Sequence, residues 1–196
     1  PALPDDLDVL SRPVTYISFD LRSTDGQKHS TRLYLDCPSP GAARAMWSRY
    51  DLHGLKAIRV GSLAQNVLDR SGDRIEIDWG HLYLAAPAGP GVQTLGATSH
   101  DRSRFAATLN LPESHDLEIP DQTDRDTALA AISYDIEVST AAPASRLLLF
   151  AYDDLYSIEY FERRLRPYWR RGGTTVEDLL TKAAADFPSL REKCRR

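Results

Sequence analysis

The sequence predicts a mainly β fold, an antiparallel β-sandwich with a short helix in a loop and a helix at the C-terminal end. Three observations carry this prediction. Many short segments alternate apolar and polar residues, turn-forming residues separate them, and a helical apolar stripe occurs only near the end of the chain. With 196 residues, the chain is long enough for one medium-sized β domain with an added helical segment.

The first two strands are expected in residues 14–22 (VTYISFDLR) and 30–36 (STRLYLD), where apolar and polar positions alternate with a period of two. Asp25 and Gly26 lie between these segments. Because both residue types tolerate the positive φ of a tight primed turn, the pattern predicts that the two strands form a hairpin.

The middle of the chain predicts further strands with turns between them. These are residues 43–48, 55–61, 74–85, 92–97, 128–138 and 145–154. In the fifth of them, Ala130, Ile132, Tyr134, Ile136 and Val138 share one face. Residues 99–110 predict a short helix capped by Ser99, and the polar residues 111–126 predict a long surface loop.

The C-terminal segment has the periodicity of a helix. Its apolar positions recur at helical spacing: Val176, Leu179, Leu180, Ala183, Phe187, Leu190 and Cys194. Thr174 and Glu177 have the spacing of a capping box, and Pro188 predicts a kink or break near Asp186. We therefore divide the chain into a sandwich, residues 1–172, and a linker helix, residues 173–196.

Composition excludes several classes of function. A formal net charge of −4 provides no field that would attract nucleic acid or an anionic membrane, and the longest apolar run, residues 147–152, is too short to span a bilayer. The five histidines lack metal-ligand spacing, and no glycine-rich phosphate loop is present, so we expect no metal and no cofactor. Cys37 and Cys194 are expected to be unpaired.

Two carboxylates in GDRIEIDWGHLYLAAP (residues 72–87) are candidates for acid/base chemistry. On a strand, Glu76 and Asp78 share a face about 7 Å apart, next to Trp79. The alternating residues Ile75, Ile77, Trp79 and Tyr83 indicate instead a half-buried strand whose acids face solvent or a neighbouring domain. We favour the second interpretation.

A run of aromatic and arginine residues, YSIEYFERRLRPYWRR, occupies residues 156–171. Such residues can stack on bases and neutralise phosphates, but residues 153–171 hold four acids against five arginines. Tyr, Trp and Arg are also enriched in protein–protein hot spots. We therefore expect this run to dock against another domain rather than to bind nucleic acid.

Three blocks of the sequence together resemble the N-terminal domain of the glutaminase A family. They are residues 11–36, residues 59–87 with IDWGHLYLA, and residues 147–171 with YSIEYFERRLRPYWRR, followed by VEDLL. The resemblance extends from about Ser11 to Cys194, and the blocks occur in the order expected for that family.

The resemblance implies a β-sandwich packed against a C-terminal (α/α) toroid of the six-hairpin type in the same polypeptide. The resemblance also implies that the whole polypeptide is a secreted or periplasmic hydrolase, which releases ammonia from L-glutamine or acts on carbohydrate. The present chain would then carry no catalytic residue, and glutamine or carbohydrate would bind at the domain interface. The expected interdomain surface consists of Tyr156, Tyr160, Arg166, Tyr168, Trp169 and Arg170, with Glu76 and Asp78 as cleft-facing candidates.

Two other classes of function stay open from the sequence. In a carbohydrate-binding module, Trp47, Trp79 or Trp169 would stack on a sugar ring. In a self-contained enzyme, Glu76 and Asp78 would be the acid/base pair.

Overall fold

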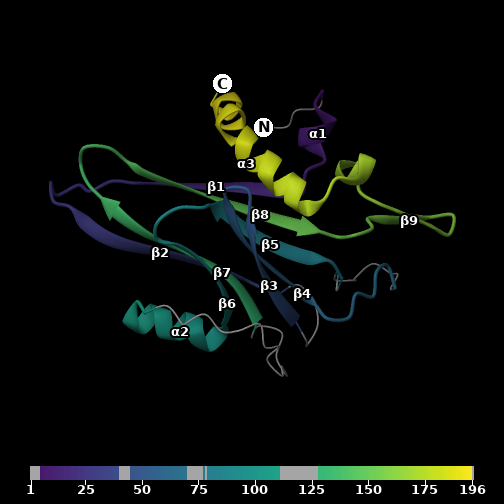
Figure 1. Ribbon diagram of the computed structural model, residues 1–196, viewed down its shortest axis with the longest axis horizontal. Helices are drawn as coiled ribbons and strands as arrows, with labels where there is room; N and C mark the ends of the chain where they lie inside the picture. The colour runs from purple at the N-terminus through teal and green to yellow at the C-terminus, as the bar shows by residue number, and fades with distance from the viewer. Residues whose placement is uncertain (1–4, 40–44, 70–76, 78, 111–127, 196) are drawn as a thin grey trace.

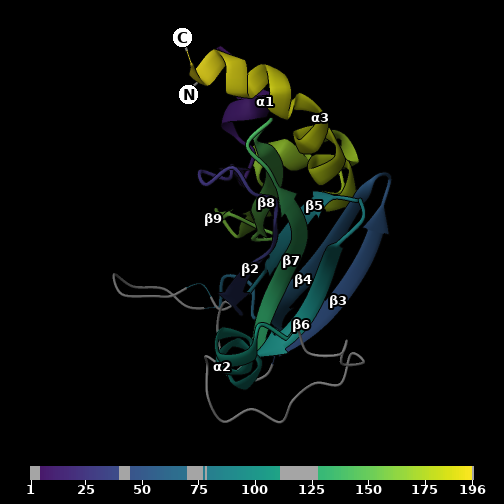
Figure 2. The same cartoon turned by 90° about the vertical axis from the view of Figure 1, so that its left-hand side faces the viewer.

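The computed structural model describes residues 5–39, 45–69, 77, 79–110 and 128–195. Within these residues, two antiparallel sheets pack face to face, and a helix covers the outer face of each (Figures 1 and 2). The larger sheet has the strand order β1-β8-β5-β4-β3, and the smaller one has the order β2-β7-β6. The mainly β fold with a short helix and a C-terminal helix is confirmed.

The elements of the larger sheet are β1 Val14–Leu21, β3 Ala45–Leu52, β4 Leu55–Ser62, β5 His81–Pro87 and β8 Ala144–Asp153. Those of the smaller sheet are β2 His29–Pro38, β6 Val92–Thr98 and β7 Ala128–Val138. The helices are α1 Leu7–Leu10, α2 Ser99–Thr108 and α3 Val176–Cys194. A separate two-stranded ribbon pairs β9 Ile158–Tyr160 with β10 Arg163–Leu165. Tyr168–Gly173 forms 3-10 turns interrupted by non-helical backbone at Arg171 and Gly172.

The main core lies between the two sheets and follows from alternation along the strands. Strand β7 sends its even-numbered residues from Ala128 to Val138 into this core, as the sequence predicts. They meet Ile58, Leu84 and Leu148 from the larger sheet, all nearly free of solvent exposure. Burying each such aliphatic side chain stabilises the fold by about 1.5–3 kcal/mol.

The larger sheet is also buried on its second face, which explains why β4, β5 and β8 are apolar at consecutive positions. Ala57, Tyr83 and Leu149 on that face pack against Leu180 and Ala183 of α3. The helix predicted as a linker thus covers the sheet and closes a second apolar core. On the opposite side of the molecule, Phe105 of α2 stacks on Tyr34 of β2, with ring centroids 4.5 Å apart.

The predicted hairpin at Asp25 and Gly26 is wrong, although both of its strands exist. Strand β1 pairs with β8 in one sheet and β2 pairs with β7 in the other. Gly26 has φ 84°, but Asp25 does not have a positive φ. A type I′ turn needs a positive φ at both central residues, so Asp25 and Gly26 do not form one. Instead the Asp25 carboxylate accepts hydrogen bonds from Ser23, the Gln27 backbone N–H and His29, which holds the chain as it crosses between sheets.

The predicted details of α3 need two corrections. Its capping box uses Thr175 and Asp178, each one residue after the predicted pair. The helix also continues through Pro188 to Cys194, so a break near Asp186 is wrong, whereas a kink there stays a prediction. Pro188 is exposed, and burial of the neighbouring Leu190 holds the helix on the sheet, so losing one N–H donor does not end it.

Candidate functional site

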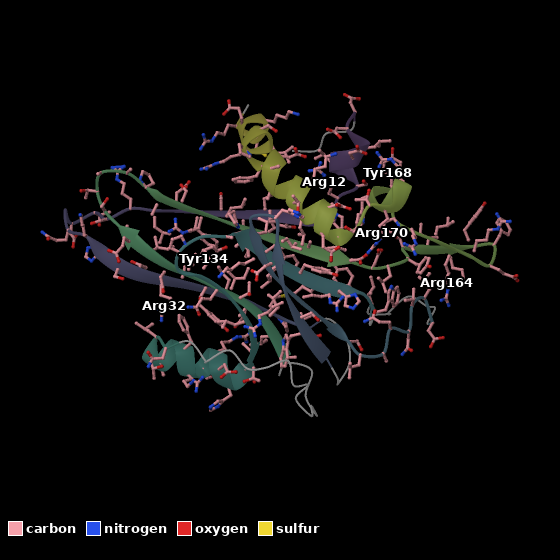
Figure 3. All side chains as sticks on the ribbon, in the orientation of Figure 1. Arg12, Arg32, Tyr134, Arg164, Tyr168 and Arg170 are labelled. Carbon is pink, nitrogen blue, oxygen red and sulfur yellow. The ribbon has the colours of Figure 1, made fainter. Side chains whose placement is uncertain are left out.

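The aromatic–arginine run of residues 156–171 divides into two structurally different parts. We call the ribbon of β9 and β10, residues 158–165, the arm, and it projects from the end of the larger sheet (Figure 1). We call Asp153, Trp169 and Arg170 the base. Figure 3 shows Arg170 at the body of the molecule and Arg164 out on the arm.

The base is built into the domain. Trp169 is 5% exposed and packs in the core formed with Val176 and Leu179 of α3. The Arg170 guanidinium lies 4.6 Å from the Trp169 ring and donates to both oxygens of Asp153, with Nε 3.1 Å from Oδ1. Asp153 is 2% exposed, so this bidentate ion pair provides hydrogen bonds to a carboxylate that has little access to water.

Two of the six residues predicted for interdomain docking, Trp169 and Arg170, lie in the base. Trp169 and Arg170 fold inward and make contacts within the domain, because the segment after Pro167 turns back onto α3. The other four predicted residues retain contact with solvent. Tyr160 and Tyr168 are 62% and 46% exposed, Arg166 is exposed, and Tyr156 is half-buried beneath the Arg166 guanidinium at 5.3 Å.

The arm has one apolar face and one charged face. Tyr160 pairs with Arg163 and Ile158 pairs with Leu165, and directly paired residues lie on the same side of a ribbon. Ile158, Tyr160 and Leu165 are 57%, 62% and 45% exposed. On the opposite side, Glu159 and Arg164 form an ion pair of 3.6 Å. The arm therefore presents apolar side chains to solvent instead of to its own domain.

The turn of the arm has an unfavourable backbone. Phe161 has φ 47° and Glu162 has φ 61°, so two consecutive residues with side chains adopt the left-handed conformation. Asn-Gly or Asp-Gly usually occupies such a turn, and each other residue costs about 1–2 kcal/mol there. Phe161 is also 81% exposed, the highest value among the exposed large apolar residues of the described chain. The composition of the run does not predict this turn. The sequence Phe161-Glu162 can be assigned to a turn only after the pairing of β9 with β10 is known.

The predicted carboxylate pair falls outside the part of the chain that the structure describes, since neither Glu76 nor Asp78 is placed there. Of the residues that we expected in the core around them, Trp79 and Tyr83 are buried, whereas Ile77 is 47% exposed. Strand β5 begins only at His81, because Gly80 adopts φ 87° and lies against the backbone of Asp153. A strand continuous over residues 74–85 is therefore wrong.

The tryptophans offer no exposed ring to a sugar. Trp47, Trp79 and Trp169 are 5%, 6% and 5% exposed. The Trp47 indole N–H donates to the Leu129 carbonyl at 2.9 Å, and that of Trp79 donates to the Asp154 carbonyl at 2.8 Å. Stacking on a sugar needs an open aromatic face, which these three positions lack.

The described residues contain no group of three or more His, Cys, Asp or Glu side chains that could hold a metal ion. Cys37 and Cys194 are free. No helix within the described ranges is both long and apolar enough to cross a bilayer.

A cavity of about 420 Å³ lies between α1, β1 and α3. The polar residues Arg12, Tyr16, Ser18 and Arg191 line it together with apolar residues and Cys194, and Arg12 pairs with Asp186 at 2.6 Å. No carboxylate is among the lining residues, so this cavity offers no pair of acids for hydrolysis.

Comparison with known proteins gives a family without an assigned activity. No curated protein matches the chain at a significant level. A family model described as a domain of unknown function (DUF5127) matches residues 1–196. Because this match covers the whole chain, the protein belongs to the DUF5127 family.

Proposed function

We propose that this DUF5127 domain is a non-catalytic docking domain of a glutaminase A-like hydrolase, and that it braces the catalytic toroid of the same polypeptide. The observation that carries the proposal is the arm, which holds apolar side chains in solvent on a base that is fixed within the domain. Exposed apolar patches of this kind mark surfaces that associate with protein.

Contacts at the base and where the arm begins hold the arm in one conformation. Asp153 and Arg170 pair at the root of the arm, the Ser157 N–H donates to the Leu165 carbonyl at 3.0 Å, and the Ser157 hydroxyl donates to Asp154 at 2.6 Å. A surface held in one conformation before association loses less conformational entropy on docking. The arm is therefore suited to a lasting interface.

The substrate, the catalytic domain and the location that we propose rest on the sequence blocks that resemble glutaminase A. By that resemblance, the polypeptide hydrolyses the amide of L-glutamine or a related substrate, the catalytic residues lie in the toroid, and the protein is secreted or periplasmic. Glutamine or carbohydrate would bind where the two domains meet.

The carbohydrate-binding alternative is less well supported than docking. Its three candidate rings are buried, and two of their indole N–H groups are already bonded to backbone carbonyls. Titration of the chain with oligosaccharides should accordingly leave the tryptophan fluorescence unchanged. Saturable quenching would favour sugar binding over the docking role.

A variant of the arm tests the proposed function directly. Tyr160→Ser/Leu165→Ser should leave the unfolding temperature of the 196-residue chain unchanged, because both side chains already face solvent. In the full-length polypeptide the same change should separate the unfolding of this domain from that of its neighbour. Leu109→Ser, at a residue 64% exposed at the end of α2, is the matched control. Joint unfolding that survives the arm variant would refute the docking role.

A further inference from the structure

The tip of the arm combines an unfavourable backbone with an exposed aromatic ring. Phe161 and Glu162 both have positive φ, and Phe161 is 81% exposed. Neither residue type is suited to a type I′ turn, which Asn-Gly would form without strain. Because the ring is mostly exposed, its contacts within the domain give little compensation for this backbone.

The Phe161 ring belongs to a continuous apolar group on the arm, which we call the wedge: Ile158, Tyr160, Phe161 and Leu165. Tyr160 packs edge-on against Phe161, with ring centroids 4.5 Å apart and an interplanar angle of 78°. Ile158 and Leu165 continue the same apolar face toward the base. Glu159 and Arg164 form an ion pair on the other face. The two faces thus have different roles, and only one of them fits an apolar surface.

The wedge also carries a positive charge. Arg163 is paired across the ribbon with Tyr160 and so lies on the apolar face. Arg163 is exposed, and no ion pair joins it to a carboxylate in the described part of the chain. An arginine beside aromatic anchors is typical of interface hot spots, where its counterpart is an acid on the partner.

We infer that Phe161 is the anchor of the docking surface: it inserts into an apolar pocket of the adjoining domain, and a carboxylate at the rim of that pocket pairs with Arg163. This inference rests on the proposed function and names the chemistry of its partner. A lipid surface is the other apolar environment that a wedge could enter. Glu159 and Glu162 next to the wedge and the net charge of −4 oppose that choice.

Phe161→Asn gives effects of opposite sign in the two settings. Asparagine tolerates positive φ, so the isolated chain should keep or gain stability. In the full-length polypeptide, hydrogen exchange at residues 158–165 should become at least about tenfold faster as docking weakens. Leu109→Asn is the control, because Leu109 is also exposed and has φ 59° but lies at the end of α2.

Arg163→Gln tests the charge. It should weaken docking in the full-length polypeptide and reduce its dependence on salt, whereas Arg164→Gln on the ion-paired face should have a smaller effect. Equal effects of these two substitutions would contradict a specific acid partner for Arg163.

Several outcomes separate this inference from the proposed function. If residues 158–165 exchange as fast in the full-length polypeptide as in the 196-residue chain, nothing covers the arm and both proposals fail. If they are protected but Phe161→Asn leaves that protection intact, docking stands and Phe161 is not the anchor. Flotation of the chain with phosphatidylcholine–phosphatidylglycerol vesicles, lost on Phe161→Asn, would assign the wedge to a membrane and overturn the inference.

Discussion

The two parts of the aromatic–arginine run have similar residues and opposite environments. In the base, an arginine and a tryptophan lie inside the domain, and the arginine is paired with a buried aspartate. In the arm, arginines, a tyrosine and a phenylalanine stand in solvent. Composition is therefore a poor guide to which of these residues are exposed. What separates the two parts is whether the backbone turns back onto α3 or continues outward as a ribbon.

Because the base is buried and the arm is exposed, substitutions in these two parts should affect different properties of the protein. Contacts of the base are made when the domain folds, so substitutions there should lower the free energy of unfolding. Side chains of the arm are exposed in the isolated domain, so truncating them should change the free energy of unfolding of the whole domain much less. Four predictions test this division, from the largest expected effect to the smallest.

Trp169→Ala should have the largest effect, because it empties a site in the core beneath α3. We expect a loss of about 3–5 kcal/mol in the free energy of unfolding, measured by urea denaturation followed by circular dichroism. Tyr168→Ala, at the exposed neighbouring residue, should change stability by less than about 0.5 kcal/mol. Similar losses for the two variants would show that burial does not distinguish Trp169 from its exposed neighbour.

Arg170→Ala should be next, since it leaves the Asp153 carboxylate buried without its charge partner. The expected loss is about 3 kcal/mol in the same urea measurement. Arg170→Ala/Asp153→Asn should recover part of it, because the remaining buried group is then neutral. A double variant no more stable than the single one would argue against an uncompensated charge as the cause.

Glu162→Gly should strengthen the arm by relieving one left-handed residue. We expect a gain of about 0.5–1 kcal/mol in the local stability of the ribbon, less than the full strain because glycine also gains freedom in the open state. The readout is slower hydrogen exchange of the Ser157 amide, which is bonded to the Leu165 carbonyl. Unchanged or faster exchange would show that the turn is not strained.

His81 should make the base mildly sensitive to pH. Burial lowers the pKa of His81 below its ordinary 6.5, Arg59 and Arg170 lower the pKa further, and Asp153 opposes them. The folded state then binds fewer protons than the unfolded state, so this contribution to stability is present above pH 6.5 and is lost as the pH falls through the lower folded value.

Urea denaturation at pH 7.5 and 5.5 should show this loss, and His81→Gln should reduce it. His53→Gln, in the exposed turn after β3, should leave the pH dependence as it is. If His81→Gln and the parent lose stability equally, the dependence arises from other groups.

Periodicity alone was sufficient to predict most of the elements. The alternation in β7, the apolar face of α3 and the placement of β4 and β8 follow from local sequence, because the period of burial matches the geometry of each element. A family resemblance and an unusual run at residues 156–171 were also visible at that level.

Tertiary structure decided the pairing and the site. Asp25 and Gly26 looked like a hairpin turn, but β1 and β2 belong to different sheets, since a strand's partner depends on distant residues. Trp169 and Tyr160 look equally suited to an interface in the sequence, yet only Tyr160 is exposed. Burial is a property of the whole packed chain, and the left-handed turn at Phe161 arises only where the two ribbon strands pair.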